Sequence, residues 1–253
     1  MNAAFKSKFV RRERLLGTVL TLPLPEIAEM ASNAGFDWLF FDMEHGLLDF
    51  TAAQRMTMAA GRHCACLARL PAATSVWIKK ALDLGLAGII VPMVNTPEEA
   101  ARVVQHAKYP PQGRRSVGVG RSHRYGANFR VYVDTANDNT TLIVQIEHIQ
   151  AVENIEAILE VPGIDGVLVG PFDLSASMGK PGYTDDPEVQ AAIQRVLQAC
   201  QQRGRPAGIF TAEPAGARQA LEQGFTLIAC SSDTLLLTGA LSGLLGQLKA
   251  PLA

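Results

Sequence analysis

The stretch Phe36-Asp37-Trp38-Leu39-Phe40-Phe41-Asp42-Met43-Glu44-His45-Gly46 sets the first expectation about the fold. A short apolar run of this kind predicts a buried strand, and such strands normally end at Ser, Asn or Gly. This run ends instead at three titratable side chains, Asp42, Glu44 and His45. The sequence therefore places acid/base and cation-binding groups at the edge of a predicted sheet.

Other predicted strands also end in polar side chains. One ends at Arg69 and a second ends at Glu147. A third ends at Gly170-Pro171-Phe172, and Asp173 follows directly after it. Four polar-tipped strands in one chain indicate a site that is assembled from strand ends.

Strand-like and helix-like segments alternate along the 253 residues. The predicted strands lie at 17–22, 38–42, 64–69, 88–94, 142–147, 166–170, 207–211 and 226–230. Helical patterns follow at 25–33, 50–60, 75–84, 97–107, 151–159, 187–203, 214–223 and 233–248. Eight such units predict an α/β fold, a single (β/α)8 TIM barrel domain over residues 1–253. An open nucleotide-binding sheet is disfavoured, because no G-x-G-x-x-G follows the first strand.

One connection, at about residues 108–141, is too long for this pattern. It contains Pro110-Pro111 and the run Arg121-Ser122-His123-Arg124-Tyr125-Gly126. Long connections in compact domains are usually functional or disordered. The Arg, His and Tyr content favours a segment that borders an anionic site, and the alternative is a surface excursion.

Composition excludes several classes of partner. The formal net charge of -1 gives no argument for a nucleic-acid partner. Basic residues cluster near the N-terminus (Lys6, Lys8, Arg11, Arg12 and Arg14). We interpret this part of the chain as a solvated segment. No apolar run approaches the ~18 residues of a membrane span, and the N-terminal residues lack the apolar core that a secretory signal would have. Four cysteines without metal or redox spacing, Cys64, Cys66, Cys200 and Cys230, predict reduced thiols in a cytoplasmic protein.

In a (β/α)8 barrel the site lies at the carboxyl ends of the strands. Gln145 and Glu147 are two residues apart and therefore share one face of their strand. A buried carboxylate is costly without a cation, so Glu147 needs one. The candidates are an ion pair with Arg69 or a metal held together with Asp173. Two carboxylates without a softer ligand favour Mg²⁺, with Mn²⁺ or Co²⁺ as alternatives, and leave room for a chelating 2-keto acid.

The lysines give a separate indication about the chemistry. An enzyme that forms a Schiff base with its substrate needs a lysine whose amine is kept neutral by burial or by a neighbouring cation. No lysine falls within a predicted strand (Lys6, Lys8, Lys79, Lys80, Lys108, Lys180 and Lys249). The distribution favours a metal over an imine.

The motifs together resemble the HpcH/HpaI family of class II pyruvate aldolases, which includes 4-hydroxy-2-oxoheptanedioate aldolase and 2-dehydro-3-deoxyglucarate aldolase. The resemblance extends from about Gly17 to Asp233. It is carried by Asp42-x-Glu44-His45, Arg69, Ile90-Val91-Pro92-Met93-Val94, Tyr109-Pro110-Pro111-x-Gly113-x-Arg115, Val144-Gln145-Ile146-Glu147 and Gly163-x-Asp165-Gly166-Val167-x-x-Gly170-Pro171-x-Asp173-Leu174-Ser175.

The resemblance implies a barrel of the phosphoenolpyruvate/pyruvate type, usually a hexamer in which the C-terminal helix is swapped between subunits. It implies these roles: Glu147 and Asp173 as metal ligands, His45 oriented by Asp42 as the acid/base group, Arg69 on the keto oxygen and enolate, Gln145 and the backbone around Phe172 against the substrate, and Asp83 at a subunit boundary near the site.

The expected activity is a divalent-metal-dependent aldol cleavage of a 4-hydroxy-2-oxo acid to pyruvate and an aldehyde, and its reverse. Two rival functions share these residues. One is a lyase that acts on an acyl-CoA, like the citrate lyase β relatives, which would need a basic CoA-binding surface. The other is a non-catalytic barrel that binds a keto acid, which would need no base such as His45.

Overall fold

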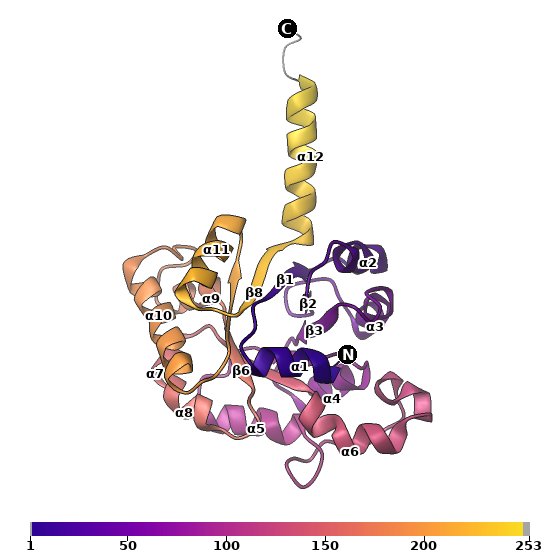
Figure 1. Cartoon of the computed structure of the whole chain (residues 1–253). Helices are drawn as coiled ribbons and strands as arrows, with labels where there is room; N and C mark the ends of the chain where they lie inside the picture. The colour runs from indigo at the N-terminus through magenta and orange to yellow at the C-terminus, as the bar shows by residue number, and fades with distance from the viewer. Residues whose placement is uncertain (1, 250–253) are drawn as a thin grey trace.

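The computed structural model describes residues 2–249, and it contains the predicted (β/α)8 barrel. Eight parallel strands close the barrel in chain order (Figure 1). They are β1 (Leu15–Leu20), β2 (Trp38–Asp42), β3 (Ala65–Arg69), β4 (Gly88–Val91), β5 (Thr141–Ile146), β6 (Gly166–Val169), β7 (Ala207–Thr211) and β8 (Leu227–Ser232). Each strand lies within three residues of its predicted bounds at either end.

The helices that follow the strands form the outer layer. They are α2 (Pro25–Asn33), α3 (Phe50–Ala59), α4 (Ser75–Asp83), α5 (Pro97–Ala107), α7 (Ile149–Glu153), α8 (Ile155–Glu160), α9 (Pro171–Ser177), α10 (Pro187–Gln202) and α11 (Pro214–Gln223). Because strand side chains alternate, neighbouring residues enter two different cores. Phe41 packs under the helices, whereas Phe40 fills the barrel interior.

The N-terminal residues form a helix that closes the amino end of the barrel. Phe5 and Phe9 of α1 (Asn2–Val10) are buried in the interior core, where the two rings stack with centroids 6.2 Å apart. Gly166 makes room for this plug, since a Cβ there would lie 2.7 Å from the Phe9 ring. Lys6 forms an ion pair with Asp165 at 3.1 Å. Four of the five basic residues predicted to be solvated are exposed (Lys8, Arg11, Arg12 and Arg14), but the apolar residues of α1 anchor the segment in the barrel, which was not predicted.

The long connection also lies at the amino end. It joins the C-terminal end of α5 to the start of β5 and contains the 3-10 helix η1 (Arg121–Gly126) and α6 (Phe129–Asn139). His123 is buried and anchors the segment: its Nε2 lies 2.8 Å from the Gly120 N–H, and its Nδ1 accepts from the Gly126 N–H at 3.1 Å. Within one chain this segment is at the opposite end from the carboxyl ends of the strands, so it does not border the site predicted there.

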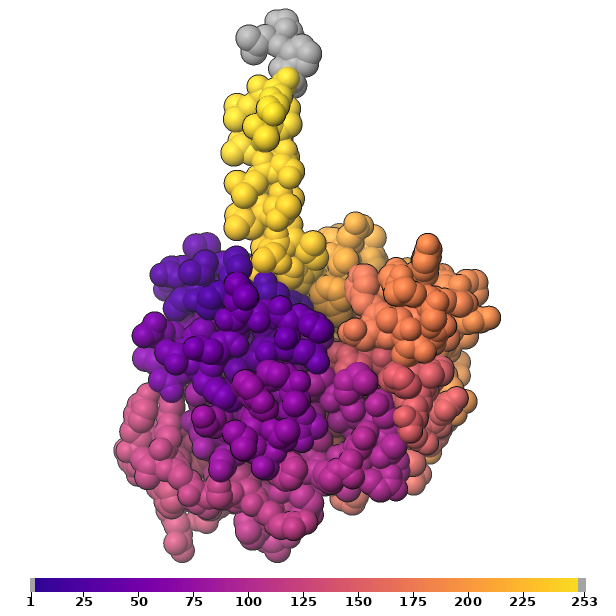
Figure 2. Space-filling model, turned by 180° about the vertical axis from the view of Figure 1, so that it is seen from behind, coloured from indigo at the N-terminus to yellow at the C-terminus, as the bar shows by residue number. Residues whose placement is uncertain are grey.

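The C-terminal helix α12 (Asp233–Lys249) projects away from the barrel (Figures 1 and 2). Its start is fixed by the buried carboxylate of Asp233, which accepts hydrogen bonds from Thr21 N at 3.0 Å, Thr21 Oγ1 at 2.7 Å and Leu22 N at 2.9 Å. Beyond this clamp, the helix exposes seven leucines (Leu235, Leu236, Leu237, Leu241, Leu244, Leu245 and Leu248). Within residues 2–249, every helix is too short or too polar to serve as a transmembrane span.

The plug formed by α1 gives a test of the interior core. Phe9→Ala removes a ring that is 1% exposed and leaves a void at the amino end of the barrel. We expect the free energy of unfolding to fall by about 3–5 kcal/mol, measured by urea denaturation. Val10→Ala on the same helix is the control, because Val10 is 49% exposed and its truncation should change little. Equal effects of the two variants would contradict the packing role of Phe9.

Candidate active site

A cavity of about 330 Å³ opens at the carboxyl end of the barrel. Interior core residues form its floor (Val19, Phe40 and Leu168), and polar residues from six strands or their following loops form its wall (Thr21, Asp42, His45, Arg69, Gln145, Asp173 and Ser232). Most of the predicted site residues therefore meet in one place. A larger cavity of about 560 Å³ lies at the amino end, but its lining includes no carboxylate, histidine or cysteine that could serve as an acid, a base or a metal ligand.

The Arg69 guanidinium is fixed by two carboxylates. In the parallel pairing of β2 with β3, Asp42 lies directly opposite Arg69. Arg69 Nε donates to Asp42 Oδ1 at 3.0 Å and Nη2 donates to Asp42 Oδ2 at 2.7 Å, so the contact is bidentate. Burial alone would raise the pKa of Asp42, but the guanidinium outweighs it and holds that pKa below its ordinary value. The hydrogen bonds of residues 2–249 leave Arg69 Nη1 available to a ligand.

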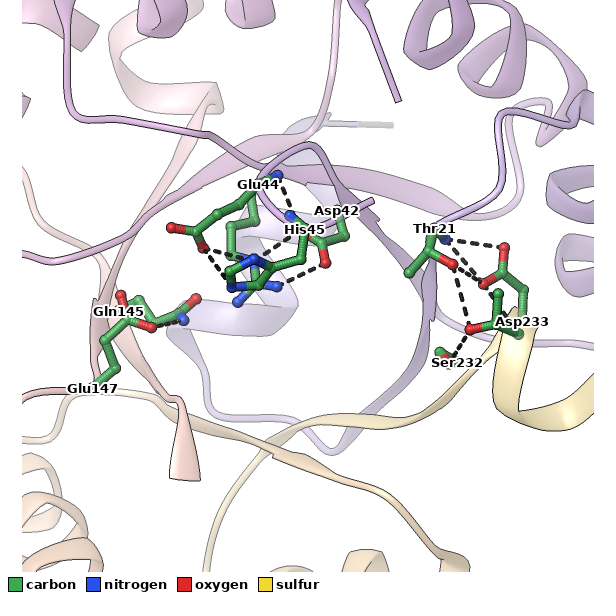
Figure 3. Close-up of polar contacts among 10 residues, drawn as sticks. Thr21, Asp42, Glu44, His45, Gln145, Glu147, Ser232 and Asp233 are labelled. Carbon is green, nitrogen blue, oxygen red and sulfur yellow. Dashed lines mark hydrogen bonds and ion pairs between the residues drawn. The ribbon is translucent and has the colours of Figure 1, made fainter. Parts of the chain in front are cut away.

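Glu44 is the second carboxylate beside Arg69. Its Oε2 lies 3.3 Å from Arg69 Nε and 3.9 Å from His45 Nε2 (Figure 3). Burial raises the pKa of Glu44 to about 6, against the opposing effect of Arg69. The prediction that Asp42 orients the His45 ring stays a prediction, because within residues 2–249 Asp42 contacts the backbone of His45 and not its ring. Asp42 Oδ1 accepts the backbone N–H groups of Glu44 and His45, and the nearest carboxylate to the imidazole is that of Glu44.

Glu147 lies across the cavity region from Arg69, just after β5. Its Oε1 accepts the Met93 N–H at 2.7 Å, and its Oε2 accepts the side-chain amide of Gln145. Burial raises the pKa of Glu147, and the nearby Asp173 carboxylate raises it further. The alternative of a buried Glu147–Arg69 ion pair is not found within residues 2–249, because Arg69 pairs with Asp42 and Glu44.

Glu147 and Asp173 fit a hard divalent cation. Asp173 enters from the first turn of α9, beside Phe172, whose ring packs against Phe210 with centroids 6.1 Å apart. Gly170 leaves space beside the side chains of Gln145 and Glu147, since a Cβ there would lie 3.0 Å from Gln145 Nε2 and 3.2 Å from Glu147 Oε2. No group of three or more His, Cys, Asp or Glu residues within 2–249 is arranged to hold a metal. Two carboxylates alone suit a cation that takes its remaining ligands from water and substrate.

Two predicted site residues are not among those that line the cavity. Glu147 lies beside the lining residues Gln145 and Gly170, whereas Asp83 lies at the other end of the barrel. It ends α4 at the amino end of the barrel and forms an ion pair with Arg115 at 2.7 Å. The Arg115 guanidinium is buried between the rings of Tyr109 and Tyr132. Asp83 therefore does not line the cavity of its own chain.

Lysines are absent from the lining of the cavity. Lys108 is the buried lysine whose pKa is lowered, to about 8, mainly by burial. It sits at the end of α5, where its Nζ donates to the carbonyl of Asn137, at the amino end of the barrel. The amine that is best prepared for imine chemistry is thus at the wrong end of the barrel for the cavity.

Three residues of the site were missed by the sequence reasoning. Thr21 and Ser232 close the cavity opposite Glu147, and Met93 donates its backbone N–H to Glu147 from a left-handed conformation with φ of 54°. Thr21 and Ser232 follow or end strands, as the other site residues do, but small hydroxyl side chains are also ordinary turn residues. The role of Met93 depends on its backbone, so its side chain gives no signal.

Comparisons with known proteins agree with this geometry. A family model described as HpcH/HpaI aldolase/citrate lyase matches residues 18–240. A hydroxypyruvate/pyruvate aldolase of Cupriavidus necator is 40% identical over 94% of this chain and 90% of its own length. A 4-hydroxy-2-oxovalerate aldolase of Rhodococcus jostii is 40% identical over 95% of this chain and 94% of its own length.

Solved structures extend the likeness to three dimensions. A crystal structure of a HpcH/HpaI aldolase/citrate lyase family protein from Burkholderia cenocepacia superposes with a TM-score of 0.94. The two are 35% identical, and the match covers 98% of this chain and 100% of the other. The chain described here belongs to the HpcH/HpaI aldolase/citrate lyase family.

Proposed function

We propose that this protein is a divalent-metal-dependent aldolase that reversibly cleaves a 4-hydroxy-2-oxo acid into pyruvate and an aldehyde. The observation that carries the proposal is the arrangement of charge in one cavity. Arg69, fixed by Asp42, lines this cavity together with Asp173, and lysines are absent from the lining. Glu147 lies next to the lining residues Gln145 and Gly170. This is a site for stabilising an enolate without an imine. The named relatives are aldolases, which supports the same conclusion.

Arg69 and His45 would have different roles in bond cleavage. The free Nη1 of Arg69 donates to the keto oxygen, where negative charge grows as the enolate forms. His45 takes the proton from the 4-hydroxyl, the bond between carbons 3 and 4 breaks, and the aldehyde carbonyl forms. The electron pair of that bond remains on the pyruvate enolate, which is protonated at carbon 3. Gln145 and the first turn of α9 at Phe172 hold the substrate beside these groups.

Glu147 and Asp173 would hold the metal. A bound Mg²⁺, Mn²⁺ or Co²⁺ supplies a Lewis acid for the keto and carboxylate oxygens of the substrate. The raised pKa of Glu147 is consistent with this role, because a carboxylate that is destabilised by burial and by Asp173 gains from a cation.

The two rival functions are less well supported. An acyl-CoA lyase needs a basic surface at the mouth of the cavity, and Arg69, the arginine among the lining residues, is already neutralised by Asp42 and Glu44. A non-catalytic keto-acid binder needs no titratable ring at the mouth. His45 is such a ring, with a side chain that is 64% exposed and in reach of substrate.

We further propose that the active form is a homo-oligomer, a hexamer with α12 swapped between subunits. The seven exposed leucines of α12 support this, since a soluble monomer rarely leaves such a face uncovered. Val117 and Val119, beside Asp83 at the amino end, are also exposed. In an oligomer, Asp83 and the connection at 108–141 would approach the cavity of a neighbouring subunit.

Metal removal tests the mechanism. EDTA treatment should abolish aldol cleavage, and added Mg²⁺, Mn²⁺ or Co²⁺ should restore it, because Glu147 and Asp173 cannot replace the Lewis acid. The measurement is pyruvate release from a 4-hydroxy-2-oxo acid. Full activity after stripping, or covalent trapping by borohydride in the presence of pyruvate, would contradict the proposal.

Arg69 gives a second test. Arg69→Ala should lower turnover by roughly a hundredfold or more, the scale for losing one oxyanion donor. Arg69→Lys should recover only part of that loss, because an ammonium cannot make the bidentate contact with Asp42. Steady-state kinetics separate turnover from KM, and Arg130→Ala on α6 is the control, since the Arg130 side chain is 91% exposed. Near-normal turnover in Arg69→Ala would reject the assignment.

The assembly is tested on α12. Leu237→Glu with Leu241→Glu places charges on the exposed apolar face without touching the Asp233 clamp. The wild-type protein should have the mass of a hexamer by light scattering, and the double variant should shift to smaller species. A wild-type protein that is an active monomer would refute the proposed assembly.

A further inference from the structure

A hollow of about 270 Å³ lies at the amino end of the barrel, where the neighbouring strands β7, β8 and β1 begin. Its walls come from the end of α1, from α10 and from the residues that precede β7 and β8. Three arginines line it and the lining includes no Asp or Glu, so the hollow is positively charged. We call it the amino-end arginine pocket (Arg11, Arg12, Leu197, Gln201, Arg205, Ala207, Gly224 and Thr226).

Two of the three arginine charges in this pocket are not compensated. Arg11 is neutralised within its own turn, because its Nε and Nη2 donate to Glu13 Oε1 at 2.9 and 2.7 Å. Arg205 donates Nη1 to the Ile164 carbonyl at 3.2 Å and forms no ion pair among residues 2–249. The Arg12 guanidinium has neither a hydrogen bond nor an ion pair in the same part of the chain. The two remaining charges match the charge of about -2 that a phosphate ester carries near neutral pH.

Arg12 occupies a backbone position that glycine normally takes. The end of α1 is closed by two hydrogen bonds, from Glu13 N to the Lys8 carbonyl at 3.1 Å and from Arg12 N to the Phe9 carbonyl at 2.9 Å. This is the Schellman arrangement, in which the residue of left-handed conformation is usually Gly. Arg12 has φ of 59° there, which costs backbone energy, and its guanidinium gains no contact in return. A strained residue of this kind is a candidate for a functional role, and here its side chain lines a positively charged hollow.

Thr226 adds an uncommitted hydrogen-bonding group to the same lining. Its backbone is engaged on both sides, since its N–H donates to the Ala207 carbonyl at 3.0 Å and its carbonyl accepts Leu15 N at 2.8 Å. Its hydroxyl is buried and has no partner within the described residues. A buried hydroxyl without a partner is costly, which is a second sign that the pocket is incomplete without a ligand.

We propose that the amino-end arginine pocket binds a phosphate group, with the guanidinium groups of Arg12 and Arg205 as its charged ligands. A guanidinium suits phosphate because it donates two parallel hydrogen bonds to a pair of oxygens. Free phosphate and a small phosphate monoester share this chemistry. The site is separate from the proposed aldolase function, because none of its residues lines the active-site cavity.

A phosphate held by both arginines would join two distant segments of the chain. Arg12 follows α1, the helix that plugs the barrel, whereas Arg205 lies between α10 and β7. The bound group would tie the plug to the wall of the barrel. Since a ligand that binds only the folded state stabilises it, phosphate should raise the midpoint of thermal unfolding.

Binding is tested by titrating the full chain with inorganic phosphate and with glycerol phosphate, against chloride at matched ionic strength. We expect Arg12→Gln and Arg205→Gln each to raise the Kd by roughly tenfold or more, the scale for losing one charge-assisted hydrogen bond. Arg14→Gln is the control, because it removes the same charge from an exposed neighbour that does not line the pocket. Tighter binding of glycerol phosphate would assign the pocket to esters, and tighter binding of inorganic phosphate would assign it to the free ion. The proposal is overturned if neither binds at millimolar concentration, or if Arg14→Gln weakens binding as much as Arg12→Gln.

Arg12→Gly gives a test that does not depend on a destabilised variant. Glycine is favoured at the left-handed position, so without phosphate this variant should unfold at the same temperature as the wild-type protein or above it. Phosphate should raise the unfolding temperature of the wild-type protein and leave that of Arg12→Gly unchanged. An equal rise in both proteins would place the phosphate elsewhere. Binding that is lost in Arg69→Ala and kept in Arg12→Gly would place it in the active-site cavity, and either result would refute the proposal.

Discussion

The contact between Asp42 and Arg69 is the interaction on which the site depends. It joins the ends of β2 and β3, and the register of the two strands places the partners directly opposite each other. A buried ion pair adds little to stability by itself, but removing one partner leaves an unpaired charge. Its value here is geometric. The bidentate contact fixes the plane of the guanidinium, and Asp42 Oδ1 also accepts the backbone N–H groups of Glu44 and His45 in the turn that follows.

Much of this arrangement follows from the sequence, for physical reasons. Strand β2 covers the apolar run Trp38–Phe41 and ends one residue later at Asp42, because burial on both faces of a barrel strand favours apolar side chains along its length. The barrel rule then brings Asp42, Arg69, Gln145 and Asp173 to one end of the sheet. Site residues at the ends of strands can therefore be predicted from the sequence when each has a charged or amide side chain.

The elements that the sequence did not reveal have a different origin. In helix α1, Phe5 and Phe9 are four residues apart and are surrounded by basic residues. Two apolar residues in such a charged segment are too few to predict a helix that packs into the core. Helix α6 follows a stretch with left-handed Arg124 and Tyr125, which no local propensity favours. The contact between Asp42 and Arg69 was not predicted either, because only the register of β2 and β3 shows that these two residues lie opposite each other.

The plug formed by α1 has a kinetic consequence for the cavity. A barrel that is filled by Phe5 and Phe9 at one end and floored by Phe40 and Leu168 has a single mouth. Whatever binds against the floor must enter first and leave last. If pyruvate occupies the inner position, the aldehyde departs before it in cleavage and arrives after it in synthesis. The order in which the two substrates bind would then depend on helix α1, although α1 lies at the opposite end of the barrel from the reacting atoms.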